Sequence, residues 1–198
     1  MKLVSLFVAG ALALGAVSGA QTPSKNVQDA NQVLINIDKL NVVKFVLPLL
    51  LKKKQIGDMM AAMEKCRSKE LEVREADAKE LLKLDADVKK AVTAAVEKGD
   101  YPDKAFQAKV IAVQEAILIR RRIAVAENVQ ILEDAAKLSL DEGQLKVMVN
   151  ILDPKSLDPS IKTDKMSDDD KRKFYLRSVF LDALTYELLK VMYKKAEN

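Results

Sequence analysis

The sequence predicts an all-α protein built around a long antiparallel helical hairpin with shorter flanking helices. Two stretches of about 45 residues carry apolar side chains at three- and four-residue intervals, the spacing of an amphipathic helix. One turn-forming segment, Gly99 to Pro102, joins them. No run of four or more residues shows the β-branched alternation between turn signals that is typical of a strand.

Residues 1–20 have the three parts of a secretory signal peptide. Lys2 supplies a short basic region, residues 3–17 form an apolar run, and residues 18–20 are a small-residue cleavage site. An apolar run of about fifteen residues is shorter than the roughly 20 that a membrane-spanning helix needs. We therefore expect an exported chain that begins near Gln21 and does not insert stably into a membrane.

The composition excludes several classes of function. The chain contains no histidine, which removes the commonest general base and the commonest metal ligand. It shows no nucleophile with a base, no glycine-rich phosphate loop and no metal-ligand spacing. The formal net charge of +4 becomes +3 without Lys2, too small an excess to indicate nucleic acid. We expect no enzyme activity, no cofactor, no metal and no nucleic-acid partner.

Cys66 is the single cysteine, so no intramolecular disulfide can hold the fold together. Two states of its thiol stay open. One is a buried, unpaired thiol, and the other is an intermolecular disulfide in an oxidising compartment.

Prolines and glycines divide the mature chain into helical segments. The first helix is expected over residues 27–47 and the second over residues 52–98. The third follows the turn, with Asp100 as its cap. The fourth begins with a capping box in which Ser139 and Glu142 each satisfy a free backbone amide of the other.

A loop with two prolines separates the hairpin domain, residues 21–153, from a C-terminal helical extension, residues 154–198. The extension is expected to pack on the same domain. Ser167 and the three aspartates after it begin a helical pair over 168–180 and 182–195, because acidic side chains complement a helix N-terminus.

Polar residues interrupt both apolar stripes at positions that match when the hairpin is folded about its turn. Asp85 is expected within a helical turn of Arg120 and Arg121, and Arg74 near Glu127. We interpret these pairs as fixing the register of the two long helices. A hairpin this thin leaves apolar surface uncovered, which favours an elongated homodimer or a bound client.

The pattern Leu-x-x-x-Gln occurs at the expected start of two helices, one before the hairpin and one after it. The first copy contains Leu51 and Gln55, and the second contains Leu140 and Gln144. We interpret these residues as structural. The leucines would be buried at helix junctions, and the glutamines would hydrogen-bond neighbouring backbone.

This order of motifs around a long hairpin resembles the LTXXQ-type periplasmic proteins, the Spy/CpxP-like group, over about residues 30–153. The resemblance implies an antiparallel dimer shaped like a shallow cradle. It also implies ATP-independent binding of unfolded proteins or an adaptor role in envelope stress. The chain departs from the motif where Lys52 and Asp141 replace its threonine. Aspartate can accept a capping hydrogen bond, whereas lysine cannot.

Two groups of side chains are candidates for client binding. Met59, Met60 and Met63 follow the first motif copy, and methionine suits surfaces that accept many partners. Arg120 and Arg121 belong to a run of three arginines. For each group a structural role stays open, with the methionines as ordinary core and the arginines as a salt-bridged cluster.

The sequence therefore indicates an exported, non-enzymatic binding protein. The leading hypothesis is a periplasmic chaperone or stress adaptor whose clients are unfolded or envelope proteins. The alternative is a structural protein of the cell envelope whose helical faces make fixed assembly contacts. Suppression of aggregation of an unfolded protein without ATP distinguishes the two.

Overall fold

The computed structural model describes residues 24–196, which are mostly helical and include no β-strand. The all-α prediction is confirmed. The expected signal peptide, residues 1–20, lies outside the described residues. The chain divides into two units, one ending at Asn36 and one beginning at Ile37. Within residues 24–196, none of the helices has the combination of length and apolarity that crossing a membrane requires.

Helix α1 (Lys25–Val46) crosses the division between the two units, and the short 3-10 helix η1 (Leu47–Leu49) follows it. The bounds of α1 lie within two residues of those expected for the first helix, residues 27–47. In the second unit, Val42 and Val46 are buried in the core. The last turns of α1 are therefore held by packing.

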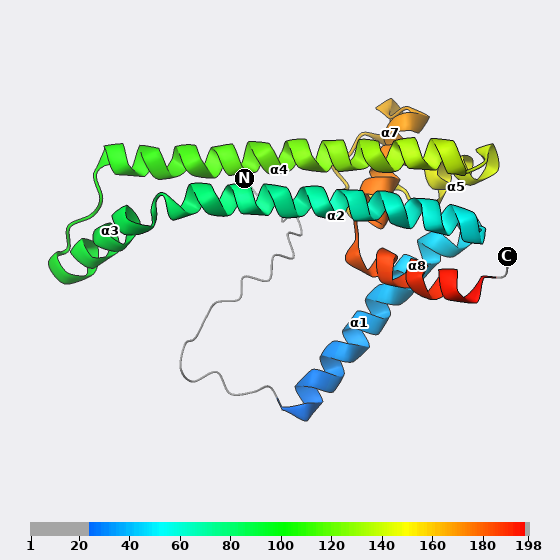
Figure 1. Ribbon diagram of the computed structural model, residues 1–198, viewed down its shortest axis with the longest axis horizontal. Helices are drawn as coiled ribbons and strands as arrows, with labels where there is room; N and C mark the ends of the chain where they lie inside the picture. The colour runs from blue at the N-terminus through cyan, green and yellow to red at the C-terminus, as the bar shows by residue number, and fades with distance from the viewer. Residues whose placement is uncertain (1–23, 197–198) are drawn as a thin grey trace. The chain divides into compact units, whose positions relative to one another are not determined.

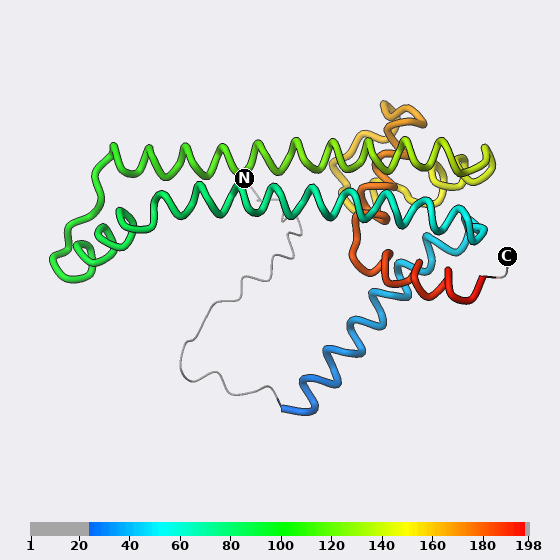
Figure 2. The backbone as a smooth tube through the Cα atoms, in the orientation of Figure 1, coloured from blue at the N-terminus to red at the C-terminus, as the bar shows by residue number. Residues whose placement is uncertain are grey.

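Helices α2 (Lys53–Leu82), α3 (Asp85–Lys98) and α4 (Lys104–Ser139) form the hairpin. α2 and α4 run antiparallel and side by side (Figure 1). The backbone trace shows α3 leaving the line of α2 before the chain turns back into α4 (Figure 2). The hairpin is thus tightly paired along α2 and more loosely paired along α3.

The prediction of a single helix over residues 52–98 is wrong, because the helix is interrupted at Lys83 and Leu84. The Leu84 amide donates to the Leu81 carbonyl, a tighter turn than that of an α-helix, and the Leu84 side chain is buried. Asp85 and Asp87 then occupy the first turn of α3, where acidic side chains complement free amides. One helix ends and another begins here without a proline or glycine.

At the hairpin turn, Gly99 ends α3 with a φ of 73°, a left-handed conformation that glycine adopts without steric cost. The amide of Asp100 donates to the carbonyl of Ala94, so Asp100 belongs to the end of α3. The expected cap of the next helix is therefore wrong. Asp103 caps α4 instead, since its Oδ1 accepts from the Phe106 amide at 2.7 Å.

The register of the hairpin also differs from the expected one. Asp77, and not Asp85, lies between Arg120 and Arg121, at 2.5 and 2.8 Å. The two aspartates are eight positions apart, which corresponds to about two helical turns. Apolar residues at helical spacing recur on every turn, so the pattern alone does not separate registers that differ by whole turns.

The second expected pair across the hairpin is also wrong, and the observed partner on α2 again lies nearer the N-terminus than the expected one. Glu127 pairs with Lys69 at 2.5 Å rather than with Arg74. Arg74 pairs with Glu70, one turn earlier on its own helix.

Beyond α4 come five further helical segments and one short 3-10 turn. They are α5 (Glu142–Ile151), α6 (Pro154–Leu157), η2 (Thr163–Lys165), α7 (Asp168–Tyr175), the π-helix η3 (Leu176–Phe180) and α8 (Ala183–Lys195). The helical pair expected over residues 168–180 and 182–195 is confirmed to within a residue. α8 packs on α2, and α7 and η3 pack on α4 (Figure 1).

The core lies where these helices meet, in a part that we call the closed end, residues 42–66 and 124–196. Its fully buried side chains include Met59, Leu132, Met148, Tyr175 and Phe180. The other part of the hairpin, residues 78–119, is called the open end. Helix α3, which belongs to the open end, has no buried residue.

Candidate functional site

The two copies of the Leu-x-x-x-Gln motif meet at the closed end, although 89 positions separate their glutamines in the chain. Gln55 Nε2 donates to Gln144 Oε1 at 2.8 Å, and Gln144 Nε2 donates to Gln55 Oε1 at 3.0 Å. Leu51 and Leu140 are both buried. The motif therefore joins the start of α2 to the start of α5.

Each motif glutamine also caps its own helix. Gln55 Oε1 accepts from the Lys52 amide at 2.9 Å, and Gln144 Oε1 accepts from the Asp141 amide at 3.0 Å. These amides belong to the residues that precede the helices and lack partners within them. The two copies thus make the same contact at two helix starts.

Each glutamine amide group then reaches the backbone that precedes the other helix. Gln55 Nε2 donates to the Ser139 carbonyl, and Gln144 Nε2 donates to the Leu49 carbonyl, both at 2.9 Å. Each side chain therefore uses two donor hydrogens and accepts two hydrogen bonds, which is the full capacity of a primary amide. No hydrogen-bonding capacity is left for a ligand, so the pair braces the helices.

The cap expected for the fourth helix is wrong. Ser139 is the last residue of α4, and its hydroxyl donates to the Ala135 carbonyl at 2.7 Å. Asp141 caps α5 instead, because its Oδ1 accepts from the Gln144 amide at 2.9 Å. Aspartate at the position of the motif threonine therefore does act as a cap.

A buried charge cluster ties the C-terminal extension to the hairpin. Glu133 of α4 has no exposed surface and accepts from Arg172 Nη2 at 2.8 Å and from Lys137 Nζ at 2.9 Å. Asp169 pairs with the same Arg172. The hydrogen bond to Glu133 raises the pKa of Lys137, and the hydrogen bond from Arg172 lowers the pKa of Asp169. Local sequence spacing does not reveal this cluster, because its members lie on α4 and α7, far apart in the chain.

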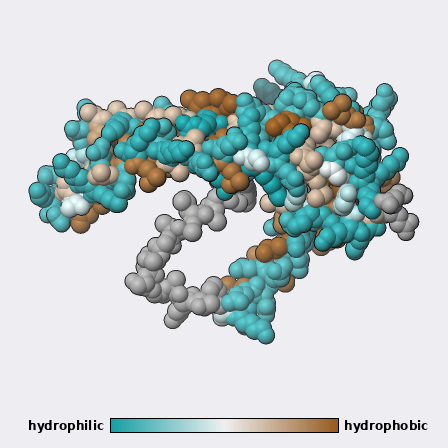
Figure 3. Space-filling view, in the orientation of Figure 1, coloured by the Kyte–Doolittle hydropathy of each residue, from teal (hydrophilic) through white to brown (hydrophobic). Residues whose placement is uncertain are grey.

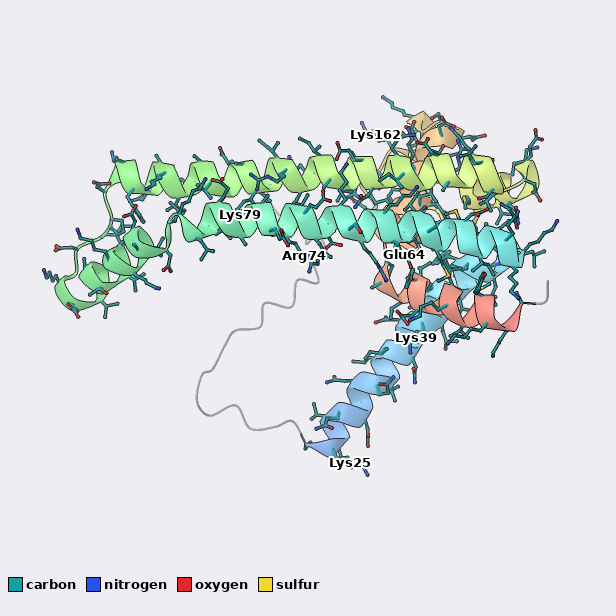
Figure 4. The ribbon with its side chains drawn as sticks, viewed as in Figure 1. Lys25, Lys39, Glu64, Arg74, Lys79 and Lys162 are labelled. Atoms are coloured by element: carbon teal, nitrogen blue, oxygen red, sulfur yellow. The ribbon has the colours of Figure 1, made fainter. Side chains whose placement is uncertain are left out.

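The extension makes further polar contacts with α1 and α2. Glu64, which lies on the side of α2 that faces α8, accepts from the Tyr186 hydroxyl (Figure 4). This hydrogen bond raises the pKa of Tyr186. The Arg67 guanidinium lies 3.7 Å from the centre of the same ring. On the other side, the Tyr175 hydroxyl donates to the Phe45 carbonyl at 2.9 Å, and burial raises the pKa of Tyr175.

The two arginines that the sequence singled out for client binding already have a partner. Arg120 Nη1 and Arg121 Nε donate to the two carboxylate oxygens of Asp77, which is 2% exposed. A buried carboxylate requires such compensation. This arrangement corresponds to the salt-bridged alternative for these arginines.

The methionines that the sequence offered as client contacts lie mainly inside the molecule. Met59 and Met63 are buried in the core of the closed end, which removes them from any client surface. Met60 is half-buried and borders a shallow hollow of about 190 Å³ beside Tyr193. Their helical spacing, which the sequence showed, is the spacing of a core face.

Cys66 is buried between α2 and α4. Its thiol donates to the Asn128 carbonyl at 3.4 Å, and burial raises the pKa of the thiol to about 11. A buried, protonated thiol is a poor partner for disulfide formation. This environment corresponds to the unpaired state among the two that the sequence left open.

The candidate binding site is an apolar groove at the open end, where α3 leaves the line of α2. It is lined by Leu81, Leu82, Leu84, Asp85, Val88, Val110, Val113 and Gln114. The hollow measures about 340 Å³, at the small end of the roughly 300–1,000 Å³ typical of ligand pockets, and it is open to solvent. An open hollow of this kind suits a side chain or short segment of another polypeptide better than an enclosed small molecule.

Exposed apolar side chains continue from the groove along α3. Leu82, the last residue of α2, is 71% exposed, Val92 and Val96 of α3 are 56% and 80% exposed, and Tyr101 in the turn after α3 is also exposed. Apolar surface is visible along the hairpin in the space-filling view (Figure 3). Single exposed apolar residues are normal, whereas a contiguous set points to an interaction site.

Charged residues that neighbour the groove-lining residues in the sequence form ion pairs. Lys109 Nζ lies 2.7 Å from Asp87, and Lys83 Nζ lies 2.7 Å from Glu80. Each lysine, through its hydrogen bond, lowers the pKa of its carboxylate partner. Asp85, the one charged residue that lines the groove, pairs with Lys89 at 2.7 Å, and the other lining residues except Gln114 are aliphatic.

The described part of the chain offers no group of three or more Cys, Asp or Glu side chains that could hold a metal ion. Comparison with protein-family models, with curated proteins and with solved structures gave no match to this chain.

Proposed function

We propose that this protein is an exported, non-enzymatic binding protein that holds apolar segments of unfolded proteins without ATP. The observation that carries the proposal is the open apolar groove at residues 81–88 and 110–114. When a partner covers exposed apolar surface, burial stabilises the complex by about 25 cal/mol for each Å² removed from water. Export is inferred from the signal-like residues 1–20.

The shape and chemistry of the groove support a broad choice of clients. Its walls are aliphatic, and its neighbouring charges are already paired. Of its eight lining residues only Asp85 and Gln114 are polar, so few polar groups fix one orientation or one ligand. Short aliphatic or aromatic segments, which unfolded chains expose, are the chemistry that fits.

The test is aggregation of a chemically denatured client diluted into buffer without nucleotide. The mature protein from residue 21 is expected to suppress light scattering. The variant Leu82→Gln/Val88→Thr makes two groove positions polar, and about tenfold more of it should be needed. The matched control Leu138→Gln/Leu157→Gln removes two exposed leucines of the closed end and should act like the wild type.

Two outcomes would contradict the proposal. One is a groove variant that suppresses aggregation as well as the wild type. The other is a wild type that protects none of several clients and binds one envelope component, as expected of a structural protein of the envelope.

A further inference from the structure

The segment between α1 and α2 carries an aliphatic side chain in a backbone conformation that does not suit it. Leu50, which follows η1, has a φ of 47° and is the one non-glycine residue with a positive φ in residues 24–196. This left-handed region favours glycine and asparagine and disfavours bulky side chains. The Leu50 side chain is 82% exposed, so packing within the chain does not compensate for the conformation. Local stability therefore does not explain a leucine at this position.

The exposed leucine stands on a rigid support. Leu47 and Pro48 of η1 are also exposed, whereas Leu49 is buried in the core. The Leu49 carbonyl accepts from Gln144 Nε2 at 2.9 Å, which fixes the segment to the start of α5. We call Leu47, Pro48 and Leu50 the apolar tip. Because the residue between them is held by the core, the tip keeps its apolar side chains in water.

Three consecutive lysines follow the apolar tip at a place where positive charge is unfavourable. Lys52 precedes α2, and Lys53 and Lys54 are its first two residues. A helix N-terminus carries a partial positive charge, which disfavours cations there. Lys54 pairs with Asp58 and still keeps 86% of its side chain exposed. As with Leu50, the local fold gains nothing from these residues, and such departures gather at functional sites.

The charges around the tip favour an anionic partner. The helix N-termini of α2 and α5 meet here through Gln55 and Gln144, and each adds about half a positive charge (Figure 1). Lys44, in the last turn of α1, is a fourth exposed lysine of this part of the chain. The acidic residues at the two helix starts are fewer: Asp58, Asp141 and Glu142. Asp58 is already paired with a lysine, and Asp141 already caps α5.

We propose that the apolar tip and the three lysines after it bind the surface of a membrane that contains anionic lipid. Leu50 projects from the molecule and forms no hollow that would hold a side chain of another protein. The interface of a bilayer takes up a projecting leucine without a complementary cavity, while lysines contact the lipid headgroups. Tyr193, whose ring centre lies 5.8 Å from Lys53 Nζ, adds a side chain common at this depth. The chain then lies on the membrane and does not cross it.

Cosedimentation of the mature chain with lipid vesicles tests the choice of partner. Vesicles of equal parts phosphatidylglycerol and phosphatidylcholine should bind the chain at least about tenfold more strongly than vesicles of phosphatidylcholine alone, because each lysine near an anionic surface adds to the attraction. Most of the difference should vanish in about 1 M salt, where charges are screened beyond about 3 Å.

The variant Leu50→Asn separates a binding role from a structural one. It should weaken binding to the mixed vesicles about tenfold, because the leucine no longer leaves water. Its melting temperature should equal or exceed that of the wild type, since asparagine adopts the left-handed conformation at lower cost. Leu157→Asn, at an exposed leucine of α6, is the matched control and should bind like the wild type. Leu50→Asn should also suppress aggregation normally, because the groove lies at the open end.

A triple lysine variant tests the electrostatic part. Lys52→Gln/Lys53→Gln/Lys54→Gln should weaken binding to the mixed vesicles about tenfold or more and leave binding to neutral vesicles unchanged. The backbone amide of Lys52 still donates to Gln55 Oε1 in this variant, so the start of α2 keeps its cap.

The matched control removes the same charge elsewhere. Lys155, Lys162 and Lys165 are exposed, and Lys162 lies beyond α4 on the side of the hairpin away from α8 (Figure 4). Lys155→Gln/Lys162→Gln/Lys165→Gln should bind mixed vesicles to within about threefold of the wild type, because these lysines do not adjoin the tip.

Four results would overturn the inference. They are equal binding to neutral and mixed vesicles, a Leu50→Asn variant that binds like the wild type, a Leu50→Asn variant that melts at a lower temperature, and equal losses in the two triple lysine variants. Displacement of the chain from vesicles by polyglutamate at matched charge concentration would identify an acidic polypeptide as the partner and overturn it too. A chain that fails these tests and still suppresses aggregation leaves the proposed function standing.

Discussion

The closed end and the open end are parts of one hairpin, yet they treat their side chains in opposite ways. The closed end buries two aromatic rings, a charge cluster around Glu133 and the paired amides of Gln55 and Gln144. The open end has an α3 without buried residues and a groove whose aliphatic walls face solvent. The buried contacts therefore gather where the two motif copies meet, and uncovered apolar surface lies at the other end of the hairpin.

The largest expected effect comes from Glu133. Glu133→Ala leaves the buried guanidinium of Arg172 without its main partner, which should cost about 3–5 kcal/mol of unfolding free energy. Urea unfolding followed by circular dichroism measures the loss. Asp169→Asn removes an exposed partner of the same arginine, which water screens, and should cost much less than Glu133→Ala. Equal costs for the two variants would contradict a buried anchor.

Cysteine labelling compares the two ends directly. Because burial raises the pKa of Cys66 to about 11, its thiolate at pH 8 should be about 100-fold scarcer than that of an ordinary thiol. Native Cys66 should therefore react with iodoacetamide at least about 100-fold more slowly than the introduced thiol of Val96→Cys at the open end.

The same pKa sets the sign of a pH effect. The Cys66 thiol keeps its proton to a higher pH in the folded state than in the unfolded state, where its pKa is 9.0. The contribution of the protonated Cys66 thiol to the free energy of unfolding is therefore complete below pH 9 and is lost as the pH rises towards 11. Rapid labelling of native Cys66 at pH 8 would show that the closed end opens readily.

The motif glutamines come next in size. Gln55→Leu and Gln144→Leu should each cost about 1–3 kcal/mol, because each leaves backbone groups and the other amide without partners. The double variant should cost less than the sum, since the two side chains share their reciprocal hydrogen bonds. Gln130→Leu, at an exposed position, should change stability by less than about 0.5 kcal/mol. Additive costs would mean that the motifs do not act as a pair.

Asp77 lies between the two ends and should show an intermediate effect. Asp77→Asn keeps the shape but loses the charge that holds Arg120 and Arg121, for a cost of about 1–2 kcal/mol. Half-exposed arginines can turn to water, which limits the loss. Glu80→Gln, on the same helix and partly exposed, is the control and should be nearly neutral. If Asp77→Asn costs more than Gln144→Leu, the tightly packed closed end extends further towards the hairpin turn and includes Asp77.

The smallest effect is expected on α3. Val92→Asn and Val96→Asn should each change the unfolding free energy by less than about 0.5 kcal/mol, because both side chains already face solvent. Thermal unfolding compared with the wild type checks this. A loss above about 2 kcal/mol at either position would indicate that the open end is packed against something in solution.

The sequence was sufficient for the features that local periodicity determines. The helical hairpin, its turn at Gly99 and the final pair of helices follow from apolar spacing and helix-terminating residues. The positions of Gln55 and Gln144 at two helix starts were also visible. The contact between the two glutamines was not visible in the sequence, because the packing of the whole chain decides which helix N-termini meet.

Other features were missed for physical reasons that particular residues show. The break at Lys83 and Leu84 carries no proline or glycine, and it depends on Leu84 being drawn into the hairpin. Asp100 and Asp103 are equally suitable caps, and the extent of the preceding helix chooses between them. Asp77 and Asp85 are two turns apart, so apolar spacing could not choose which of them faces the arginines.

Hydrogen exchange of the backbone amides, read by NMR or by mass spectrometry of short peptides, tests the division of the hairpin most directly. Amides of residues 56–66 and 128–138 should exchange only through near-global unfolding, whereas those of residues 88–98 should exchange at least about 100-fold faster through local opening. Equal protection of the two sets would contradict the account.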